Sequence, residues 1–412
     1  MFGWEFPPYQ AGGLATATLG LVKGLLQTGL QVTLVVPFPI DGRVLPELRL
    51  VSTAGLRVAL RRVRVPSSLT PYGGVGEYAA GRAAAARRIP GTRGTTPYGV
   101  DLFHEIERFS DVAAEIAETE PHDVIDCHDW ITYPAARRAH EVSGRPLVAH
   151  IHATERDRSG AGENAEIRRR EREGLLAADH IICNSLRMRR QVVESYKVDP
   201  ARIHVVPWGL DDPSAAPDVP EPQPFPDDEP VVLFVGRVTR QKGPEYFIEM
   251  ARRVADVVPH VRFVVVGTGD LLPQIIDRTV ELGLAERVHF TGGVSGPDVD
   301  RAFRMATVCV MPSVSEPFGL VALESLRNGT PVIVARNAGV AEVVRNALRA
   351  DFWDIERMAD QVAGIIRYHE LHRELRAHGL EEVTHPRFGL AEPARRTVDI
   401  YQRALVGAVR SH

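Results

Sequence analysis

Two long stretches of the chain alternate strand-sized apolar runs with helix-sized segments, and this alternation limits the fold more than any other feature. In the first stretch, apolar residues recur at helical spacing from Leu14 to Gln27. Strand-like runs rich in β-branched residues follow at Val32–Pro37, Asp123–Cys127, Leu147–His152 and His180–Asn184. Strands separated by helices pair in parallel, so we expect an α/β unit with a doubly wound sheet.

The alternation resumes after residue 230. Strands are expected at Val231–Val235, Arg262–Val266, Val288–Phe290, Val308–Met311 and Pro331–Ala335. Helices are expected from Pro244, through Ile275 and Val280, around Val299–Met305 and over Gly319–Arg327. The pattern therefore predicts a second Rossmann-like unit. Two such units facing each other across a cleft would hold a ligand at the carboxyl ends of both sheets.

The segment from residue 211 to residue 230 separates the two stretches. It contains seven prolines, seven acidic residues and no basic residue. Such a composition disfavours both a helix and a central strand, so we expect an extended linker. The sequence thus predicts an N-terminal domain over residues 1–210 and a C-terminal domain over residues 231–388. Residues 389–412 are expected to form a helix that packs back on the N-terminal domain.

Composition excludes several classes of protein. The formal net charge of the 412 residues is -4, so no overall positive field would draw the chain to nucleic acid. Its three cysteines lie far apart in apolar runs, which favours small buried side chains in a reducing cytoplasm: Cys127, Cys183 and Cys309. No apolar run reaches the length of a membrane span, and the N-terminus has no secretory pattern. We therefore expect a cytoplasmic protein.

The segment Ser315–Glu324 carries the most specific pattern. A strand is expected to end near Pro312, a loop then carries Glu316, and a helix begins close to Gly319. The N–H groups of a first helical turn bind anions, aided by the helix dipole. Taken alone, the two glutamates are better interpreted as an acid near a helix start and a surface partner of Arg327. The complete string, including its proline, phenylalanine and glycine, is far more specific.

That string matches the E-x7-E signature of retaining glycosyltransferases with the GT-B fold. The whole chain resembles glycosyltransferase family 4 and, within it, the glycogen-synthase-like group, also at Asp351–Asp354 and Gly379–Val383. The resemblance implies that Glu316 contacts the hexose of a nucleoside-diphosphate sugar and that Glu324 binds its ribose. The residues at the helix start would meet the phosphates: Phe318, Gly319 and Leu320.

A second motif runs from Gly236 to Pro244, directly after an expected strand. Pro244 suits the first position of a helix, where its missing N–H costs nothing. Arg237 and Lys242 would then flank a helix start, where two cations can bind a diphosphate. In isolation they could equally be solvated loop cations. The same G-R-x-x-x-Q-K-G pattern occurs in the resembled family, where this arginine and lysine neutralise the leaving nucleoside diphosphate.

A glycine pair, Gly12-Gly13, precedes the first helix and lets a backbone approach a phosphate. Alone it is more often a simple turn, but it resembles the loop of the family that contacts donor and acceptor. Bacterial glycogen synthases carry a lysine just before this loop, where this chain has Tyr9-Gln10-Ala11. That departure favours family 4 and weakens an ADP-glucose assignment.

The resemblance also concerns the N-terminus. Members of the family begin with a short apolar strand, whereas this chain opens at Met1-Phe2-Gly3-Trp4-Glu5. The first strand therefore looks missing. Losing a central strand would expose a sheet edge and remove core area. We expect a few restored apolar residues upstream to raise thermal stability.

Histidines follow two of the expected strands. By alternation, His150 and His152 point to the same side of their strand, with His152 nearer its end. A histidine in such a place is often a satisfied loop residue. The resemblance implies that His152 contacts the donor hexose and that His128, Asp129 and Trp130 form an acceptor-side motif. Metal binding by the histidines is disfavoured because no carboxylate or cysteine spacing supports it, and no metal or other cofactor is expected.

Glycine-containing turns end two further strands of the second unit, at Gly267 and just after Thr291. They are expected to shape the nucleotide pocket, although glycine after a strand is ordinary turn chemistry. Gly236, which ends an earlier strand, is assigned to the donor site in the same way. Asp298 and Asp300 have the D-x-D form of metal-dependent transferases. We interpret them as acidic residues in a first helical turn.

These motifs together predict a transferase that moves a hexose, with glucose favoured, from UDP- or ADP-glucose to an acceptor hydroxyl with retention. The acceptor would be a glycan, for example an α-glucan, or a small molecule. One alternative is a non-catalytic nucleotide-sugar-binding protein, whose hallmark would be loss of Glu316, Arg237 or Lys242. Another is a different enzyme on the same fold, such as an epimerase or a phosphorylase. The sequence leaves the acceptor open.

Overall fold

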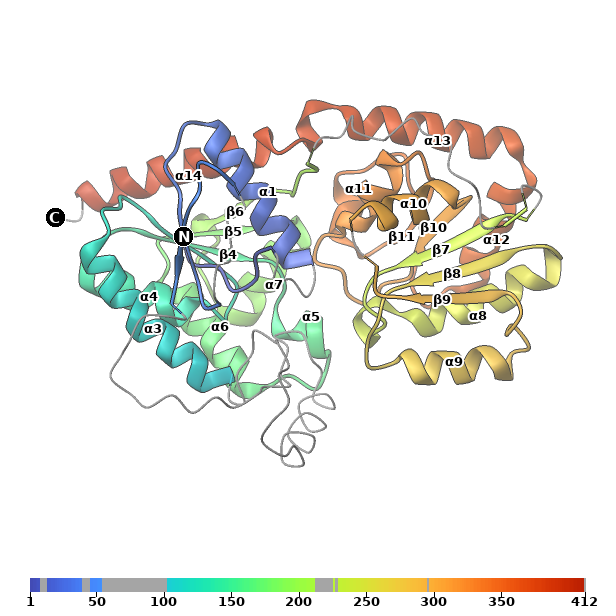
Figure 1. Ribbon diagram of the computed structural model, residues 1–412, viewed down its shortest axis with the longest axis horizontal. Coiled ribbons are helices and arrows are strands. Elements are labelled where there is room, and N and C mark those ends of the chain that lie inside the picture. Colours follow the sequence, from blue (N-terminus) through green and yellow to red (C-terminus); the bar gives the residue numbers. More distant parts are fainter. Residues whose placement is uncertain are drawn as a thin grey trace. The chain divides into compact units, whose positions relative to one another are not determined.

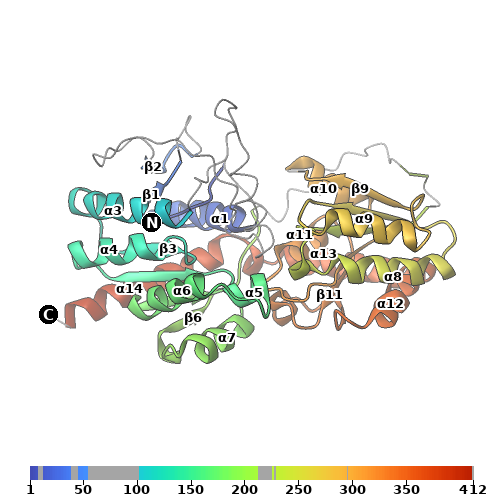
Figure 2. The same ribbon diagram turned by 90° about the horizontal axis from the view of Figure 1, so that it is seen from below.

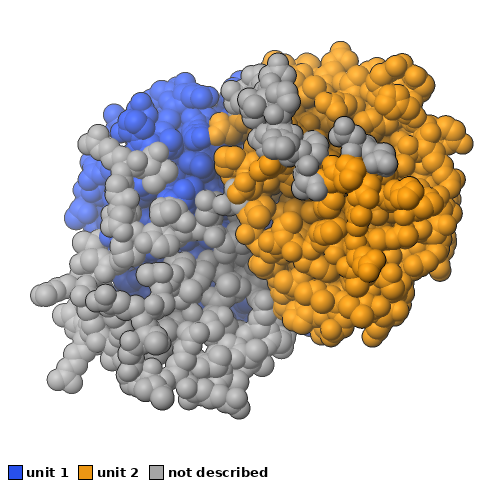
Figure 3. All heavy atoms as spheres, turned by 45° about the vertical axis from the view of Figure 1, so that its right-hand side comes forward, with its two compact units in different colours: residues 1–207, 390–412 blue, residues 208–389 orange. Residues whose placement is uncertain are grey.

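The structure is a computed structural model that describes residues 1–7, 13–38, 45–53, 102–211, 225–226, 229–294 and 296–410, with side chains to residue 407. Gly12 and most of the segment 211–230 lie outside the described residues. The chain forms two compact units, one of residues 1–207 with 390–412 and one of residues 208–389 (Figure 3). The two α/β bodies that the family resemblance implies are therefore present.

The first unit is built on parallel strands. Its four-stranded sheet has the order β3 (Ile125–His128), β4 (Leu147–Ile151), β5 (His180–Cys183) and β6 (Ile203–Val205). A second parallel pair joins β1 (Thr33–Val36) to β2 (Arg49–Ser52). β3, β4 and β5 are buried almost throughout, as central parallel strands require.

Phe2 lies between these two sets of strands. It forms parallel bridges to Val35 of β1 and to Cys127 of β3. Its N–H donates to the Asp126 carbonyl at 2.7 Å, and the N–H of His128 donates to the Phe2 carbonyl at 3.3 Å. The Phe2 ring is buried and meets Phe109 edge-on at 6.0 Å. Phe2 therefore makes the backbone contacts that a strand between β1 and β3 would make.

Helices cover both faces of this sheet (Figures 1 and 2). One face carries α3, α4, α6 and α7; the other carries α1 and the C-terminal helix α14, which contacts α1, β4 and β5. Their bounds, with the short α5, are α1 Gly13–Gln27, α3 Leu102–Thr119, α4 Tyr133–Ser143, α5 Glu155–Ser159, α6 Ala165–Ala177, α7 Leu186–Tyr196 and α14 Ala391–Arg410. The sheet therefore buries both its faces.

Local capping chemistry sets several of these boundaries. Thr154 and Asp157 form a reciprocal capping box at the start of α5, and Ser185 accepts from the Met188 N–H at the start of α7. Gly144 ends α4 in the left-handed conformation, at φ 66°. These side chains satisfy backbone groups that a helix end leaves open.

The second unit contains one six-stranded sheet with the order β12-β11-β10-β7-β8-β9, and every pairing in it is parallel. The strands are β7 Val231–Val235, β8 Arg262–Val266, β9 Val288–Gly292, β10 Val308–Met311, β11 Val332–Ala335 and β12 Leu348–Ala350. The order reverses direction beside β7, as in a doubly wound sheet.

Alternate residues of these strands enter two different cores. Val232 and Phe234 pack toward α8 and α12, whereas Leu233 packs toward α10, α11 and α13. The helices are α8 Pro244–Val257, α9 Leu272–Glu281, α10 Pro297–Met305, α11 Leu320–Arg327, α12 Ile355–Arg367 and α13 His369–Thr384. The prediction of a doubly wound sheet is confirmed for this unit.

Cys127, Cys183 and Cys309 are free and buried, which confirms their reading as small core side chains. Among the described residues, no helix has both the length and the apolar character needed to cross a membrane.

Candidate active site

Two loops of the second unit bring the charged motif residues together. Residues 236–243 follow β7, and residues 312–319 follow β10, the strand beside β7 in the sheet. Because parallel strands present their carboxyl ends at one edge, both loops emerge there. Lys242 ends a short 3-10 turn over Arg240–Lys242, and Glu316 lies in the loop before α11.

The Lys242 ammonium group pairs with the Glu316 carboxylate. Nζ of Lys242 donates to Oε2 of Glu316 at 2.6 Å, and the Ser313 hydroxyl donates to the same oxygen at 3.2 Å. The Glu316 side chain is 6% exposed and that of Lys242 is 20% exposed. A buried carboxylate needs such partners, since desolvation of an unpaired charge is costly.

Arg237 is held from within its own loop. Its Nη2 donates to the Gln241 side-chain oxygen at 2.9 Å, and Gln241 is buried. This bond from a neutral amide acceptor orients the guanidinium group within the loop. The loop therefore carries one cation neutralised by Glu316 and one oriented by an amide.

Glycines let the two loops take their shape. Gly243, at φ 66°, precedes α8, and an added Cβ there would lie 2.1 Å from the Pro312 carbonyl oxygen. Gly267, at φ 139°, follows β8, and its Cβ would lie 1.9 Å from the Gly236 carbonyl oxygen. Gly236 itself has φ 147°. These positions exclude any side chain, so the backbones after β7, β8 and β10 stay in close contact.

The helix start at α11 has the geometry that the sequence predicted. Gly319 precedes the helix at φ 111°, and Leu320 is its first residue. Phe318 is buried and anchored by the bond from the Val340 N–H to its carbonyl at 2.7 Å. The first N–H groups of α11 thus point out from a fixed turn beside Glu316.

Glu324 lies in the second turn of α11 and is half-buried. Burial raises the pKa of its carboxyl, while Arg327 and Lys242 act in the opposite direction. Asp300 also raises this pKa and accepts from Nη2 of Arg327 at 2.6 Å. Lys242 is therefore close enough to act electrostatically on both glutamates of the motif.

Thr291 lies inside β9 and is exposed, so the strand continues beyond the expected end at Phe290. Its hydroxyl donates to the Gly292 carbonyl at 3.0 Å. The Gly292 carbonyl also accepts from the Gly267 N–H at 2.8 Å. Thr291 thus stands at the same edge of the sheet as Gly267, one strand away.

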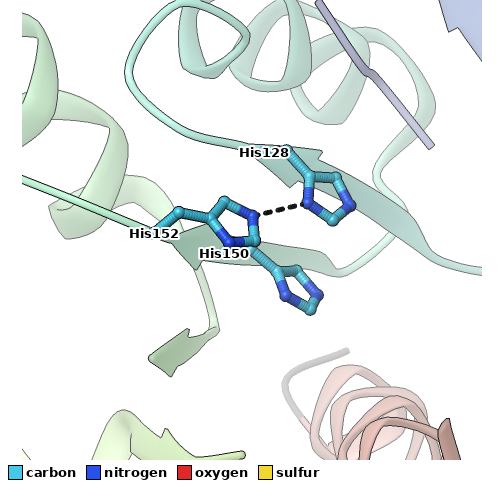
Figure 4. A group of neighbouring side chains, drawn as sticks. All are labelled: His128, His150 and His152. Atoms are coloured by element: carbon cyan, nitrogen blue, oxygen red, sulfur yellow. Dashed lines mark hydrogen bonds between the residues drawn. The ribbon is translucent and has the colours of Figure 1, made fainter. Parts of the chain in front are cut away.

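The first unit gathers three buried histidines at the ends of β3 and β4 (Figure 4). His128 and His152 stack with ring centroids 5.1 Å apart, and His128 and His150 stack at 4.5 Å. Nδ1 of His128 lies 2.8 Å from Nε2 of His152, at hydrogen-bonding distance. The expected orientation of His150 and His152 to one side of the chain is confirmed.

A carboxylate that no sequence motif indicated lies beside these rings. Asp126 of β3 is buried and lies 3.1 Å from Nε2 of His128 and 2.9 Å from Nε2 of His150. Burial raises the pKa of Asp126, but the two histidines outweigh it and hold that pKa far below its ordinary value. Burial lowers the pKa of His128 and, more strongly, that of His152, so both favour the neutral form.

Such a stack is a hydrogen-bonding arrangement. Zinc needs nitrogen lone pairs that converge on one point at about 2.0–2.1 Å. Parallel rings direct their in-plane lone pairs side by side, and Nδ1 of His128 and Nε2 of His152 lie at hydrogen-bonding distance from each other. The three nitrogens remain a group that could be tested for a metal ion.

The acceptor-side motif is mostly internal. Trp130 is 2% exposed and packs near Phe103, with ring centroids 6.2 Å apart. Asp129 takes the left-handed conformation at φ 61°, and its carboxylate accepts from the His152 N–H at 2.7 Å. These residues therefore fix the backbone at His152.

Gly13, at the start of α1, is exposed and has no atom within 4 Å of an added Cβ.

Comparisons with known proteins agree with this arrangement. The model of the group 1 glycosyl transferases matches residues 216–381, and that of glycosyltransferase family 4 matches residues 11–212. An uncharacterised glycosyltransferase of Methanocaldococcus jannaschii is 27% identical over 98% of both chains. D-inositol 3-phosphate glycosyltransferase 2 of Catenulispora acidiphila is 31% identical over 69% of this chain and 71% of that one.

Solved structures show the same fold. Sucrose-phosphate synthase from Thermosynechococcus elongatus aligns over 98% of both chains with a TM-score of 0.74 and 20% identity. Anabaena HepE in complex with UDP-glucose aligns over 98% of both chains with a TM-score of 0.68 and 16% identity. The fold and the family matches together define a GT-B glycosyltransferase that uses a nucleotide sugar. The chain belongs to glycosyltransferase family 4, with a C-terminal domain of group 1.

Proposed function

We propose that the chain transfers a hexose from a nucleoside-diphosphate sugar to an acceptor hydroxyl and retains the configuration at the anomeric carbon. The observation that carries this proposal is the Lys242–Glu316 pair at 2.6 Å, beside the start of α11. It places an ammonium group, a carboxylate and a helix N-terminus at one edge of one sheet. A sugar diphosphate needs these same three groups.

The ion pair suits a site in which Lys242 exchanges the Glu316 carboxylate for the phosphates of the donor. A diphosphate offers Lys242 more negative charge than a single carboxylate does, so donor binding would move Nζ from Glu316 to the phosphates. Glu316 would then be released to accept from a hydroxyl of the hexose. Arg237, oriented by Gln241, and the N–H groups near Phe318 and Leu320 would complete the phosphate contacts.

In the reaction, the bond between the anomeric carbon and the diphosphate oxygen breaks. The acceptor oxygen forms its bond to that carbon on the same face, and its proton passes to the departing diphosphate. Lys242, Arg237 and the α11 terminus stabilise the charge that develops there. Glu316 is held by Lys242 and Ser313, which suits a sugar contact better than attack on carbon. His152 contacts the hexose, and Glu324 holds the ribose.

UDP-glucose is the favoured donor and ADP-glucose the second. The solved HepE structures of Anabaena contain UDP, or UDP with glucose, or UDP-glucose, which supports a uridine donor for this fold. Gly267 and Thr291 would shape the pocket for the base. No metal ion takes part in the proposed reaction.

A phosphorylated polyol or sugar is the favoured acceptor class, with an α-glucan as the alternative. Named relatives include D-inositol 3-phosphate glycosyltransferases at 30% and 31% identity over about two thirds of the chain. Sucrose-phosphate synthase, a structural neighbour, also has a phosphorylated sugar in its name. Both names concern those proteins and motivate the acceptor panel for this one.

The test is a matrix of UDP-, ADP- and GDP-sugars against inositol phosphates, hexose phosphates and α-glucans, with release of nucleoside diphosphate as readout. Proton NMR of the glycosidic product gives the anomeric configuration. A UDP-glucose-dependent α-linked product is expected. A β-linked product would overturn retention. Binding of a donor without any release, even by hydrolysis, would indicate a non-catalytic binding protein, and epimerised donor would indicate an epimerase.

A further inference from the structure

The side chain of Tyr401 links the C-terminal helix α14 to the carboxylate beside the histidine stack. Tyr401 of α14 donates its hydroxyl hydrogen to Oδ2 of Asp126, 275 positions earlier in the chain. The same oxygen accepts from Nε2 of His150 at 2.9 Å. Asp126 is 3% exposed, so its charge is compensated by these neighbours and not by solvent.

The face of the sheet explains why these groups meet. Asp126 pairs in register with Val148, and His128 pairs with His150, so all four side chains leave the sheet on one side. Val148 packs in one cluster with Ile400 and Ala404 of α14. The polar stripe from Asp126 to His152 therefore runs along the face that α14 covers.

The polar contacts of His128 and His152 favour one tautomer for each of these two rings. Nε2 of His128 lies 3.1 Å from Oδ1 of Asp126 without hydrogen-bond geometry. A proton on this nitrogen attracts the carboxylate, whereas a lone pair there would repel it, so the contact favours the Nε2–H form of His128. In a neutral ring, Nδ1 of His128 is then an acceptor, and Nε2 of His152 donates to it at 2.8 Å. His152 is consequently the Nε2–H tautomer, and its Nδ1 is an acceptor nitrogen.

We propose that Asp126 and Tyr401 are positioning residues that fix the tautomer and the ring plane of His152 through His128. The inference rests on the proposed function, in which His152 contacts the donor hexose. An Nδ1 acceptor receives a hydrogen bond from a sugar hydroxyl, whereas the opposite tautomer would present a donor. The C-terminal helix thereby determines which hydrogen bond the sugar-binding histidine can make.

The variant Asp126→Asn should exchange the donor and acceptor nitrogens of both His128 and His152. The amide oxygen takes the place of Oδ2, because two donors, Tyr401 and His150, point there. The amide N–H₂ group then faces His128, whose Nε2 must become an acceptor. His128 then donates from Nδ1, and His152 must become the Nδ1–H tautomer. Long-range ¹H–¹⁵N correlation spectra of ¹⁵N-histidine-labelled protein distinguish the two tautomers.

Tyr401→Phe is the milder variant, and Tyr196→Phe is its matched control. Tyr401→Phe removes one donor from Asp126 but keeps both histidine contacts, so the tautomers stay and the carboxylate is held less firmly. Tyr196 also donates its hydroxyl to a buried carboxylate in the same unit, that of Glu171. It belongs to a different network, and its variant should leave the histidine spectra and the kinetics unchanged.

The expected results are an Nε2–H tautomer for His152 in the wild type and an Nδ1–H tautomer in Asp126→Asn. We expect kcat/KM for the donor to fall about 10- to 100-fold in Asp126→Asn and several-fold in Tyr401→Phe. An Nδ1–H tautomer in the wild type would overturn the proposal. So would donor kinetics in Tyr401→Phe and Asp126→Asn that match Tyr196→Phe. If the wild type turned over no donor, the proposed function would be overturned instead. The spectra would still show whether Asp126 determines the tautomer of His152.

Discussion

Nζ of Lys242 lies 2.6 Å from Oε2 of Glu316, so the ammonium and the carboxylate at this site neutralise each other. The two residues are 74 positions apart and come from loops that follow neighbouring strands, β7 and β10. Their pairing keeps a nearly buried carboxylate compensated until a more highly charged partner arrives. Each member therefore affects a different stage of the proposed reaction.

Lys242→Met should lower kcat/KM by about 10²- to 10³-fold, because one cation is removed from the site where the leaving diphosphate develops charge. Arg240→Ala is the control, since Arg240 lies two residues earlier in the same 3-10 turn and is exposed. Steady-state release of nucleoside diphosphate measures both. Equal losses in the two variants would show that the general charge of the turn matters and that the Lys242–Glu316 pair does not.

Glu316→Gln and Glu324→Gln should separate sugar binding from ribose binding. Glu316→Gln weakens a hexose contact made during transfer, so kcat should fall with a smaller change in KM. Glu324→Gln weakens a ribose contact that is present throughout, so KM for the donor should rise with kcat nearly unchanged. Titration calorimetry with free UDP gives the cross-check: affinity should fall only for Glu324→Gln. If KM rose for Glu316→Gln and kcat fell for Glu324→Gln, Glu316 would instead contact the ribose and Glu324 the hexose.

Three central strands of the second unit were predicted to the residue, whereas three edge strands were not predicted at all. Val231–Val235, Arg262–Val266 and Val308–Met311 match β7, β8 and β10, because strands buried on both faces read as continuous apolar runs. β2, β6 and β12 went unnoticed. Each ends its run of strands, is three or four residues long and is only partly buried. An edge strand therefore carries a weak apolar signal.

The site was predictable only where local motifs carried it. The motif around Glu316 could be recognised in the sequence, because its loop and the helix start after it are contiguous in the chain. Asp126 and Tyr401 gave no such signal, because their contact depends on how α14 packs on the sheet. One local hint existed for Asp126, since it lies two residues before His128 and so shares its face of the strand.

Gly243→Ala should disrupt the site by a backbone clash. An added Cβ would lie 2.1 Å from the Pro312 carbonyl oxygen, and φ of 66° already disfavours a side chain. We expect a loss of unfolding free energy of about 1–3 kcal/mol together with a displaced Lys242. Gly364→Ala in α12 is the opposite case, because nothing lies within 4 Å of its added Cβ. It should stabilise the protein by about 0.5–1 kcal/mol in urea denaturation. A stable Gly243→Ala variant would show that the loop relaxes freely.

Removal of divalent metal should leave activity unchanged. Lys242, Arg237 and a helix N-terminus would compensate the charge of the diphosphate without a metal ion. In the histidine stack, ring nitrogens already contact one another and the Asp126 carboxylate. The measurement compares donor turnover before and after dialysis against EDTA, with metal content determined by mass spectrometry. Turnover that disappears on chelation and returns with zinc or magnesium would contradict the proposed metal-free reaction. His150→Gln would then show whether the stack holds that ion.

A buried carboxyl in α6 should make stability fall as pH rises. Glu171 is 1% exposed and accepts from Arg158 and Tyr196. Burial raises the pKa of Glu171 from 4.5 to about 7, although both partners oppose the rise. The folded state therefore binds the proton more tightly than the unfolded state does, and this contribution is complete below pH 4.5 and lost as pH rises through 7. It amounts to at most about 3 kcal/mol.

The measurement is the difference in unfolding free energy between wild type and Glu171→Gln, by urea denaturation from pH 4.5 to pH 8. Taking the difference cancels the histidines, such as His204, whose lowered pKa of about 4 works in the opposite direction. The wild type should lose stability relative to the variant across that range. Glu173→Gln is the control for the loss of a carboxylate from the same helix, because the Glu173 side chain is more exposed. A flat difference for Glu171→Gln would mean that Arg158 and Tyr196 keep the carboxyl ionised despite its burial.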